Sequence, residues 1–398
     1  MTSRTPHAAS LALALLMAGS TAASAACQAS GAGFDAWLAG FKQQAVTAGV
    51  APAVVEAGLS GVTYDASVVK KDRGQGVFSQ TFLEFAGRMV ASYRMQHGAN
   101  HIAKQANLFS RIEADYGVPA EVLVAIWGLE SDFGANTGDM STLRSLATLA
   151  FDCRRPHLFG PELVAALKIV QAGDLTPQAM RGAWAGELGQ TQFLPTNYLI
   201  YGVDYDGDGR RDLIKSSADV LASTANFLAR LGWQRGQPWL VEVTVPREMP
   251  WADAHLAEKK SADAWASLGV KARSGNIPPG NAALYLPMGR NGPAFLAYPN
   301  FDVYLGWNES LVYATTAAYF ATRLAGAPKV SDGSGPVEVL RAPEIKAVQQ
   351  ALASRGIDPG PIDGKLGRLT REAVRTAQIQ LSLPADGWPD TALLRALR

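Results

Sequence analysis

Glu130 is the residue whose surroundings point most directly to acid–base chemistry. It ends the apolar run 122–129, and the polar, glycine-punctuated stretch 131–134 follows at once. An apolar run of this kind indicates a buried helix, so the carboxyl group at its end should be partly desolvated. Desolvation raises the pKa of a carboxyl group, which can then stay protonated near neutral pH and act as an acid. The alternative is a solvated carboxylate near a helix C-terminus, where the helix dipole would disfavour it.

Four stretches of the sequence carry side chains that could act together. They are residues 128–134 around Glu130, 145–155 with two adjacent arginines, 186–198 with two glutamines, and the acidic 204–212. In this order and spacing they resemble the lytic murein transglycosylase B family, over roughly residues 27–325. The pairing of G-x-E-[ST], here Gly128–Ser131, with G-Q-x-Q-F-x-P, here Gly189–Pro195, is specific, whereas either motif alone would be weak.

The resemblance implies a mainly α (α+β) fold, with a lysozyme-like helical core and a minor β and loop region. It also implies an enzyme that cleaves the MurNAc–GlcNAc β-1,4 bond of peptidoglycan with one carboxylic acid and no cofactor. By motif position that acid is Glu130. It protonates the leaving oxygen and then, as a base, takes the proton of the sugar's own 6-hydroxyl, which leaves a 1,6-anhydro end. A second carboxylate, which most glycosidases need, is then unnecessary.

The resemblance also implies a set of substrate-binding residues: Ser131, Arg154, Arg155, Gln190, Gln192, Phe193, Tyr198 and Phe227. Glutamine amides suit sugar hydroxyl and acetamido groups, and arginine suits the carboxylates of peptidoglycan. Structural alternatives stay open: Gln192 could pin a turn, Phe193 could belong to the core, and the arginines could form surface salt bridges. Phe227 stands where the family has a tyrosine, which removes a hydroxyl group.

Other candidates carry weaker signals. Asp132 is expected to orient the loop after Glu130, and Glu187 is either a second acidic residue of the cleft or a solvated one. Further aromatic residues are candidate sugar-stacking surfaces, although most aromatic residues are core. They are Trp127, Tyr298, Tyr304 and Trp307.

The acidic stretch 204–212 begins like an EF-hand calcium loop, because aspartates alternate at positions 204, 206 and 208 before Gly209. The glutamate usual at loop position twelve is replaced by Lys215, and the family comparison suggests that Asp219 completes the site. We therefore expect a structural calcium outside the chemistry, with an acidic solvated turn as the alternative. The expected ligands are Asp204, Asp206, Asp208, Arg210 and Asp219.

Residues 1–26 are typical of an export signal, with Arg4 and His7 before the apolar run Leu11–Met17 and small residues at the cleavage site. The apolar run is too short to span a bilayer, and no later segment reaches that length without charges. A periplasmic mature protein is expected. An oxidising compartment favours a disulfide between Cys27 and Cys153. The alternatives are a lipid anchor on Cys27, which the absence of a leucine at Ser24 disfavours, and two buried thiols.

The domain organisation follows from composition. Helices are expected over residues 34–110, 119–235 and 311–324, a strand over 239–245, and loops with short strands over 246–310. The catalytic domain is placed at 27–326 and a Pro/Gly-rich linker at 327–340. Residues 341–398 resemble the peptidoglycan-binding type 1 domain through G-x-I-D-G-x-x-G-x-x-T. A leading helix is expected over 342–354, and two Asp-Gly turns, each just before a helix that a threonine helps to start, complete a predicted three-helix module.

The sequence therefore predicts a periplasmic lytic transglycosylase with a tethered wall-binding domain and peptidoglycan as its partner. A net charge of +1 gives no electrostatic attraction to nucleic acid. Two alternatives stay open: a muramidase that hydrolyses the same bond, and a non-catalytic peptidoglycan-binding scaffold. The end groups of the products distinguish them.

Overall fold

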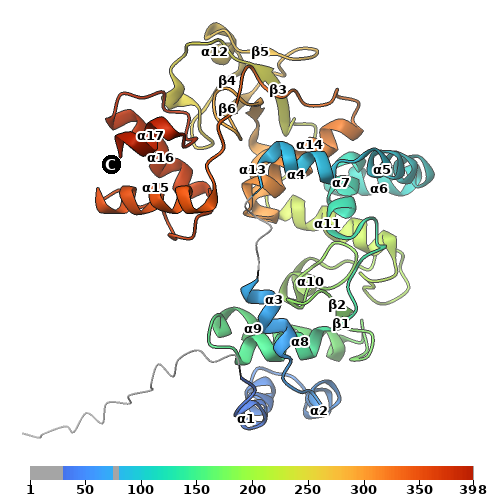
Figure 1. The fold of residues 1–398 in the computed structure, drawn as a ribbon. Coiled ribbons are helices and arrows are strands. Elements are labelled where there is room, and N and C mark those ends of the chain that lie inside the picture. The colour runs from blue at the N-terminus through green and yellow to red at the C-terminus, as the bar shows by residue number, and fades with distance from the viewer. Residues whose placement is uncertain (1–29, 75–79, 398) are drawn as a thin grey trace, which may run out of the picture.

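The computed structural model describes residues 30–74 and 80–397, and over these ranges the chain is mainly helical (Figure 1). The predicted signal peptide and Cys27 lie outside the described residues. The predicted mainly α fold class with a minor β region is confirmed. Among the described residues no helix combines the length and the apolar character that crossing a membrane requires.

One group of helices forms the lower part of the molecule in Figure 1 and shares one hydrophobic core. It consists of α1 (Phe34–Thr47), α2 (Pro52–Leu59), α3 (Ala66–Arg73), α8 (Thr142–Phe151), α9 (Pro156–Ala172) and α10 (Pro195–Tyr201). Two short antiparallel strands, β1 (Met140–Ser141) and β2 (Arg181–Gly182), lie beside them. The helix predicted to begin at residue 34 is confirmed, and Phe34, Leu38 and Phe41 recur on the face of α1 that is buried in this core.

A second group of helices surrounds α7 (Ala120–Ser131) in the upper part of the molecule. Its other members are α4 (Phe82–Met89), α5 (Ser92–Lys104), α6 (Ala106–Tyr116), α11 (Ser217–Arg230), α13 (Pro299–Trp307) and α14 (Leu311–Leu324). Nearly every residue of α7 is buried, which explains why its sequence is a continuous apolar run rather than a stripe. The helix ends with Asp132 in the left-handed conformation, at φ 55°.

An antiparallel sheet in the order β4-β6-β7-β3-β5 packs on this second group. Its strands are β3 (Leu240–Thr244), β4 (Lys259–Ser261), β5 (Lys271–Ala272), β6 (Asn281–Tyr285) and β7 (Ala294–Ala297). The strand predicted over residues 239–245 is confirmed as β3. The interpretation of 246–310 as loops and short strands was incomplete, because this range also contains the short 3₁₀ helix Trp251–Asp253, α12 (Ala262–Ser267) and α13. Pro299 at the first position of α13 is a helix-start signal that the Pro/Gly-rich composition obscured.

The C-terminal module has the three predicted helices, α15 (Ala342–Ser354), α16 (Arg368–Gln380) and α17 (Thr391–Ala396), around its own core. Each Asp-Gly turn is held by a buried glutamine: Gly364 N donates to Gln349 Oε1 at 2.8 Å, and Gly387 N donates to Gln378 Oε1 at 2.9 Å. The threonines that were expected to help start the following helices do not cap them, although Thr391 is the first residue of α17. Gly367 and Asp390 occupy the N-cap positions of α16 and α17.

The segment between the two domains is bound to the first domain along much of its length. Ser331 donates to Glu242 through its backbone N–H (2.8 Å) and its hydroxyl (2.7 Å), and Ser334 N donates to Asn291 O at 2.8 Å. Gly333 sits so close to Asn291 O that a Cβ atom there would be 2.2 Å from it. The structure therefore differs from the freely moving tether that a Pro/Gly-rich composition predicts.

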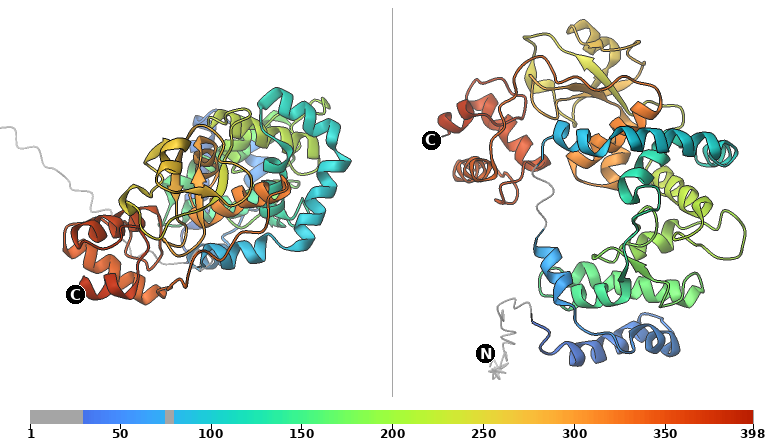
Figure 2. Two further views of the ribbon diagram at one scale, coloured as in Figure 1. Left: turned by 90° about the horizontal axis from the view of Figure 1, so that it is seen from above. Right: turned by 45° about the vertical axis from the view of Figure 1, so that its right-hand side comes forward.

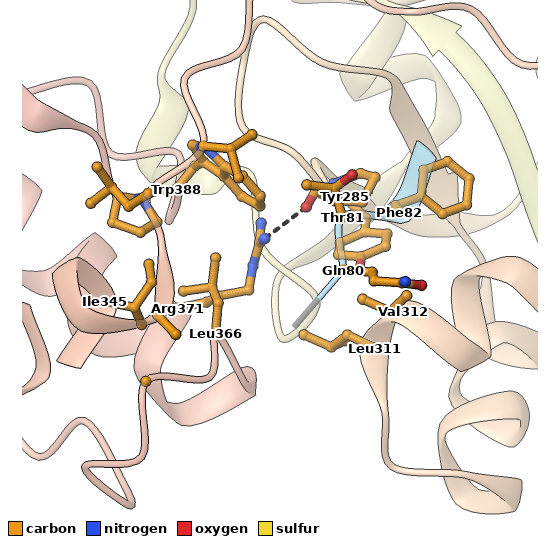
Figure 3. A pocket seen from close by; sticks show the side chains of 16 residues that line it. Gln80, Thr81, Phe82, Tyr285, Leu311, Val312, Ile345, Leu366, Arg371 and Trp388 are labelled. Carbon is orange, nitrogen blue, oxygen red and sulfur yellow. Dashed lines mark hydrogen bonds between the residues drawn. The ribbon is translucent and has the colours of Figure 1, made fainter. Parts of the chain in front are cut away.

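Arg371 of α16 docks the C-terminal domain onto the loop after β6. Its guanidinium donates to the carbonyl oxygens of Leu286 and Pro287, the latter at 2.9 Å, and lies 5.5 Å from the ring of Trp388. Arg290 adds an ion pair to Asp386 at 3.1 Å. Figure 3 shows Arg371 reaching across the pocket between the two domains. The views in Figure 2 show the C-terminal helices beside the sheet, away from the lower helices.

Candidate active site

Two long-range hydrogen bonds position the carboxyl group of Glu130. Glu130 is the last but one residue of α7, and its side chain is half-buried. Its Oε1 atom accepts hydrogen bonds from the hydroxyl of Tyr313 at 2.5 Å and from Nε1 of Trp307 at 3.0 Å. The donors come from α14, which packs along α7, and from α13, which packs on α14. Since both bonds go to Oε1, Oε2 is left available for a substrate.

The environment of Glu130 suits a group that gives up and takes back a proton. Its pKa is raised to about 7: burial is the largest cause and negative charge on Glu187 adds to it, while the hydrogen bonds from Tyr313 and Trp307 oppose the increase. The desolvation predicted from the apolar run is thus the largest cause. A carboxyl group with a pKa near the working pH is both a usable acid and a usable base.

The loop after Glu130 is tied to the segment 186–198. The hydroxyl of Ser131 donates to the backbone carbonyl of Gln190, and it accepts from Gly134 N at 2.9 Å. Asp132 accepts from the Tyr93 hydroxyl at 3.2 Å and from Arg94 Nε at 3.1 Å. Ser131 and Asp132 therefore hold the loop in place, and Ser131 contacts backbone groups rather than the Glu130 carboxyl group.

The two glutamines are engaged within the protein. Gln190 Oε1 accepts from Trp127 Nε1 at 2.9 Å, while its amide donates to Ile214 O at 2.9 Å. Gln192 lies in the left-handed region at φ 54°, and its amide donates to Gly189 O at 2.7 Å and to Thr137 O at 3.2 Å. These contacts match the turn-pinning alternative for Gln192.

The aromatic candidates lie mostly in the core. Phe193 packs against Phe227 and Trp307, with ring centroids 5.7 and 5.6 Å apart, and Phe193 is only 2% exposed. Tyr198 is fully buried, and its hydroxyl donates to a backbone carbonyl. The remaining candidates are core as well, namely Trp127, Tyr298 and Tyr304. Phe193 and Phe227 thus support Trp307, which in turn holds Glu130.

Arg154 and Arg155 both form ion pairs with the buried Asp72 at the end of α3. Arg154 also donates to the backbone carbonyl of Asp72 at 2.8 Å. The arginine pair therefore joins α3 to the start of α9, as the salt-bridge alternative supposed, although its carboxylate partner is buried rather than exposed.

The acidic loop brings three of its predicted ligands together. Asp204, Asp206 and Asp219 each offer an oxygen atom, and these atoms lie within 4.8 Å of one another. Burial raises the pKa of Asp219, although hydrogen bonds from backbone N–H groups of the loop act in the opposite direction. Asp208 instead pairs with Arg210, whose Nε lies 3.2 Å from Asp208 Oδ2. A set of clustered carboxylate oxygens fits a hard cation such as calcium.

The sequence pointed to Glu130 but missed Tyr313 and assigned Trp307 a different role. Tyr313 lies 183 residues after Glu130, inside a helix that was predicted from its apolar pattern alone. Its polar hydroxyl on an otherwise buried helix face is the one signal that could have identified it, because a buried tyrosine hydroxyl usually has a partner.

Comparisons with known proteins bear on the family of the chain. The chain matches the family described as "Transglycosylase SLT domain" over residues 33–322, and "Putative peptidoglycan binding domain" over residues 341–397. It is similar to the crystal structure of SltB3 from Pseudomonas aeruginosa in complex with NAG-anhNAM-pentapeptide, with 39% identity and a TM-score of 0.84, over 92% of this chain and 99% of that one. It also resembles the Escherichia coli lytic transglycosylase Slt35 in complex with calcium, with 26% identity and a TM-score of 0.63, over 72% and 92% of the chains.

A curated relative is the membrane-bound lytic murein transglycosylase B of Escherichia coli strain K12. It is 29% identical over 238 residues, which are 58% of this chain and 64% of that protein. The match thus spans somewhat less than two thirds of the length of the relative. Because the family match extends over most of the chain and includes the Glu130 region, the chain belongs to the transglycosylase SLT domain family and carries a peptidoglycan-binding domain after it.

Proposed function

We propose that this protein is a lytic transglycosylase that cleaves the MurNAc–GlcNAc β-1,4 bond of peptidoglycan and leaves a 1,6-anhydroMurNAc end. The observation that carries the proposal is the half-buried Glu130 carboxyl group: its pKa is raised to about 7, and both hydrogen bonds that it accepts from the described residues go to Oε1 rather than Oε2. The relative SltB3 was solved in complex with NAG-anhNAM-pentapeptide, which contains the anhydro sugar expected as a product.

The reaction needs one group that is first an acid and then a base. Protonated Glu130 gives its proton to the glycosidic oxygen as the bond to the anomeric carbon breaks. The resulting carboxylate takes the proton of the 6-hydroxyl of the same MurNAc, and that oxygen closes onto the anomeric carbon. Glu130 is then protonated again, and no water is consumed. Tyr313 and Trp307 stabilise the carboxylate between the two proton transfers, because both donate to Oε1.

The test is an end-group measurement on purified peptidoglycan. We expect mass spectrometry of the products to find 1,6-anhydro ends, and the Glu130→Gln variant to release none. Glu121→Gln is a matched control, because it removes a carboxylate from the first turn of the same helix. Products with only reducing MurNAc ends would indicate a hydrolytic muramidase, and wild-type protein that binds peptidoglycan without cleaving it would indicate a scaffold.

We propose that the protein is exported to the periplasm after removal of residues 1–26, with Cys27 paired to Cys153. The support is the signal pattern in the sequence together with the cell-wall substrate of the family. Mass measurement of the mature protein under non-reducing and reducing conditions tests this. A product that begins near Cys27 and gains two hydrogens on reduction is expected, whereas a lipid-sized mass increase on Cys27 would establish the alternative anchor.

We propose that the acidic loop binds a structural calcium ion through Asp204, Asp206 and Asp219. The support is the clustering of their oxygen atoms and the calcium complex of the related Slt35. The ion would brace the loop that follows the segment 186–198, without taking part in the reaction. We expect calcium to raise the thermal stability of the wild type but not that of an Asp206→Ala, Asp208→Ala variant. Equal shifts in both proteins would argue against a specific site.

A further inference from the structure

A groove of about 590 Å³ lies between the first domain and the C-terminal domain. One wall consists of residues 302–306 of α13 and of Glu309, and the other consists of the loop 359–367 and the start of α16. The groove shares no lining residue with the pocket in Figure 3. Its volume falls within the range of about 300–1,000 Å³ that is typical of ligand-binding sites.

The loop that forms the C-terminal wall is held by buried side chains behind it. The amide of Gln349, which is fully buried, donates to Pro361 O at 2.9 Å and to Lys365 O at 3.0 Å. The hydroxyl of the buried Thr370 donates to Pro359 O at 2.8 Å. Because these bonds come from inside the domain, the side chains that line the groove are carried by a fixed backbone.

The two walls are also fixed relative to each other. Arg371, one turn into α16, donates to the carbonyl oxygens of Leu286 and Pro287 in the first domain. Arg290 of the first domain pairs with Asp386 at 3.1 Å. The groove is therefore formed before a ligand arrives, and binding does not have to bring the two domains together first.

Each wall carries an exposed charged side chain that has no ion pair among the described residues. These side chains are Glu309, in the turn between α13 and α14, and Arg368, the first residue of α16. Two other carboxylates of the groove are engaged within the protein, because Asp302 pairs with Lys259 at 2.8 Å and Asp363 accepts a backbone N–H of its own loop at 2.9 Å. The groove therefore offers one negative and one positive group to a ligand, from opposite walls.

Apolar surface and the candidate active site adjoin these charges. Leu369, which follows Arg368 and also lines the groove, is 48% exposed. On the other wall, residues 302–306 belong to the helix that ends at Trp307, whose Nε1 donates to Glu130 Oε1 at 3.0 Å. A ligand in the groove thus lies against the helix that positions the catalytic carboxyl group.

The stem peptide of peptidoglycan has the chemistry and the attachment point that this groove requires. An uncross-linked stem ends in a carboxylate, carries the amino group of its diamino acid, and has alanine methyl groups along its length. Arginine binds carboxylates through paired hydrogen bonds, and a glutamate binds an amino group. The stem is attached to MurNAc, the sugar whose anomeric bond breaks in the proposed reaction, so its attachment point lies next to Glu130.

We propose that the groove between α13 and the loop 359–367 binds an uncross-linked stem peptide, with Arg368 on a peptide carboxylate and Glu309 on the amino group. The C-terminal domain then not only holds the enzyme on the cell wall but also recognises the substituent on a MurNAc near the cleaved bond. Strands that carry stem peptides are cleaved in preference to bare glycan. The inference rests on the proposed function, which supplies peptidoglycan as the substrate.

The experiment compares anhydro-product formation from glycan strands that keep their stem peptides and from the same strands after an amidase has removed them. Wild-type protein should have the higher kcat/KM on the peptide-bearing strands. Arg368→Gln and Glu309→Gln should each lower that kcat/KM by about fivefold, the upper range for an exposed ion pair, mainly through KM. Neither variant should change cleavage of the bare strands, whereas damage to the fold would affect both substrates.

Matched controls are Lys346→Gln and Glu113→Gln, which remove exposed charges that do not line the groove. Both should keep the wild-type preference for peptide-bearing strands, and Arg368→Lys, which keeps the charge, should retain most of it. Equal kcat/KM of wild-type protein on the two substrates would refute the peptide site. A loss in Arg368→Gln that is the same on both substrates would refute it as well.

A binding measurement separates this inference from the proposed function. The probe is the stem peptide that the amidase releases, observed by saturation-transfer NMR with the full chain. Wild-type protein should give a signal that Arg368→Gln and Glu309→Gln weaken, while equal signals from all three proteins would overturn the site. If wild-type protein binds the peptide but forms no anhydro ends on either substrate, the proposed function fails and the groove stands.

Discussion

Replacing Glu130 by glutamine should make the protein more stable at alkaline pH while abolishing catalysis. In the folded protein, burial raises the pKa of Glu130 to about 7 from the ordinary value of 4.5. Between these two pH values the folded state holds a proton that the unfolded state has released. Folding stability must therefore fall as pH rises through this window, because the unfolded chain binds fewer protons than the native one. Below pH 4.5 both states are protonated, and the effect vanishes.

The magnitude follows from the difference between the two pKa values. A difference of about 2.5 between about 7 and 4.5 corresponds, at 1.36 kcal/mol for each pKa unit, to a cost of about 3 kcal/mol once the pH is well above 7. Glutamine cannot ionise, so the variant avoids this cost. Its amide oxygen can still accept hydrogen bonds from Tyr313 and Trp307. For a domain of this size, about 3 kcal/mol corresponds to a rise in Tm of roughly 5 °C.

The assay is thermal unfolding of wild-type protein and Glu130→Gln at pH 4.5 and pH 8. The difference in Tm between the two proteins is compared at each pH, so that groups common to both cancel. This Tm difference should be near its minimum at pH 4.5, and at pH 8 it should be larger by the rise in Tm derived in the preceding paragraph. Glu121→Gln, compared in the same way, should show no such increase. A Tm difference for Glu130→Gln that is the same at both pH values would refute the reasoning, because Glu130 would then have an ordinary pKa.

Two further predictions concern hydrogen bonds that the structure brings together. Tyr313→Phe removes a donor to the Glu130 carboxylate, so the pKa of that carboxyl group should rise by about 1 and the alkaline limb of the pH–rate profile should move upward; Tyr304→Phe, which removes a buried hydroxyl without a hydrogen-bond partner among the described residues, should leave the limb in place. Arg371→Ala should release the C-terminal domain and speed proteolytic cleavage within 327–340, without changing cleavage of short soluble glycans; unchanged proteolysis would contradict the docking role.

Patterns of residues adjacent in sequence predicted those helices whose signals also lie within a short stretch of the chain. The helix over 311–324 and the helix over 342–354 were predicted with the ends that α14 and α15 have, because apolar periodicity and flanking breakers are adjacent in sequence. The prediction was incomplete for α13. The proline and glycine residues around α13 are typical of a loop. The segment is nevertheless helical, because its apolar residues are buried against other elements.

Contacts between distant segments could not be predicted. The bonds that hold residues 327–340 to the first domain involve Glu242 and Asn291, and no pattern within the segment itself indicates them. Likewise, Arg155 was expected to bind a substrate carboxylate, whereas the fold supplies Asp72 from α3 as its partner. Composition indicates how stiff a segment would be on its own. Only the packed structure shows which groups of the rest of the protein form hydrogen bonds with that segment.

The sequence by itself indicated that Glu130 would be a desolvated carboxyl group, because the continuous apolar run that directly precedes it predicts a buried helix. The motifs around it also determined the family. Only the tertiary structure decided how strongly Glu130 holds its proton. The donors that lower its pKa come from Trp307 and Tyr313, and the charge that raises it comes from Glu187. These residues meet only when α7, α13, α14 and the glycine-rich turn pack together, and electrostatic interactions depend on that distance in space rather than on separation in sequence.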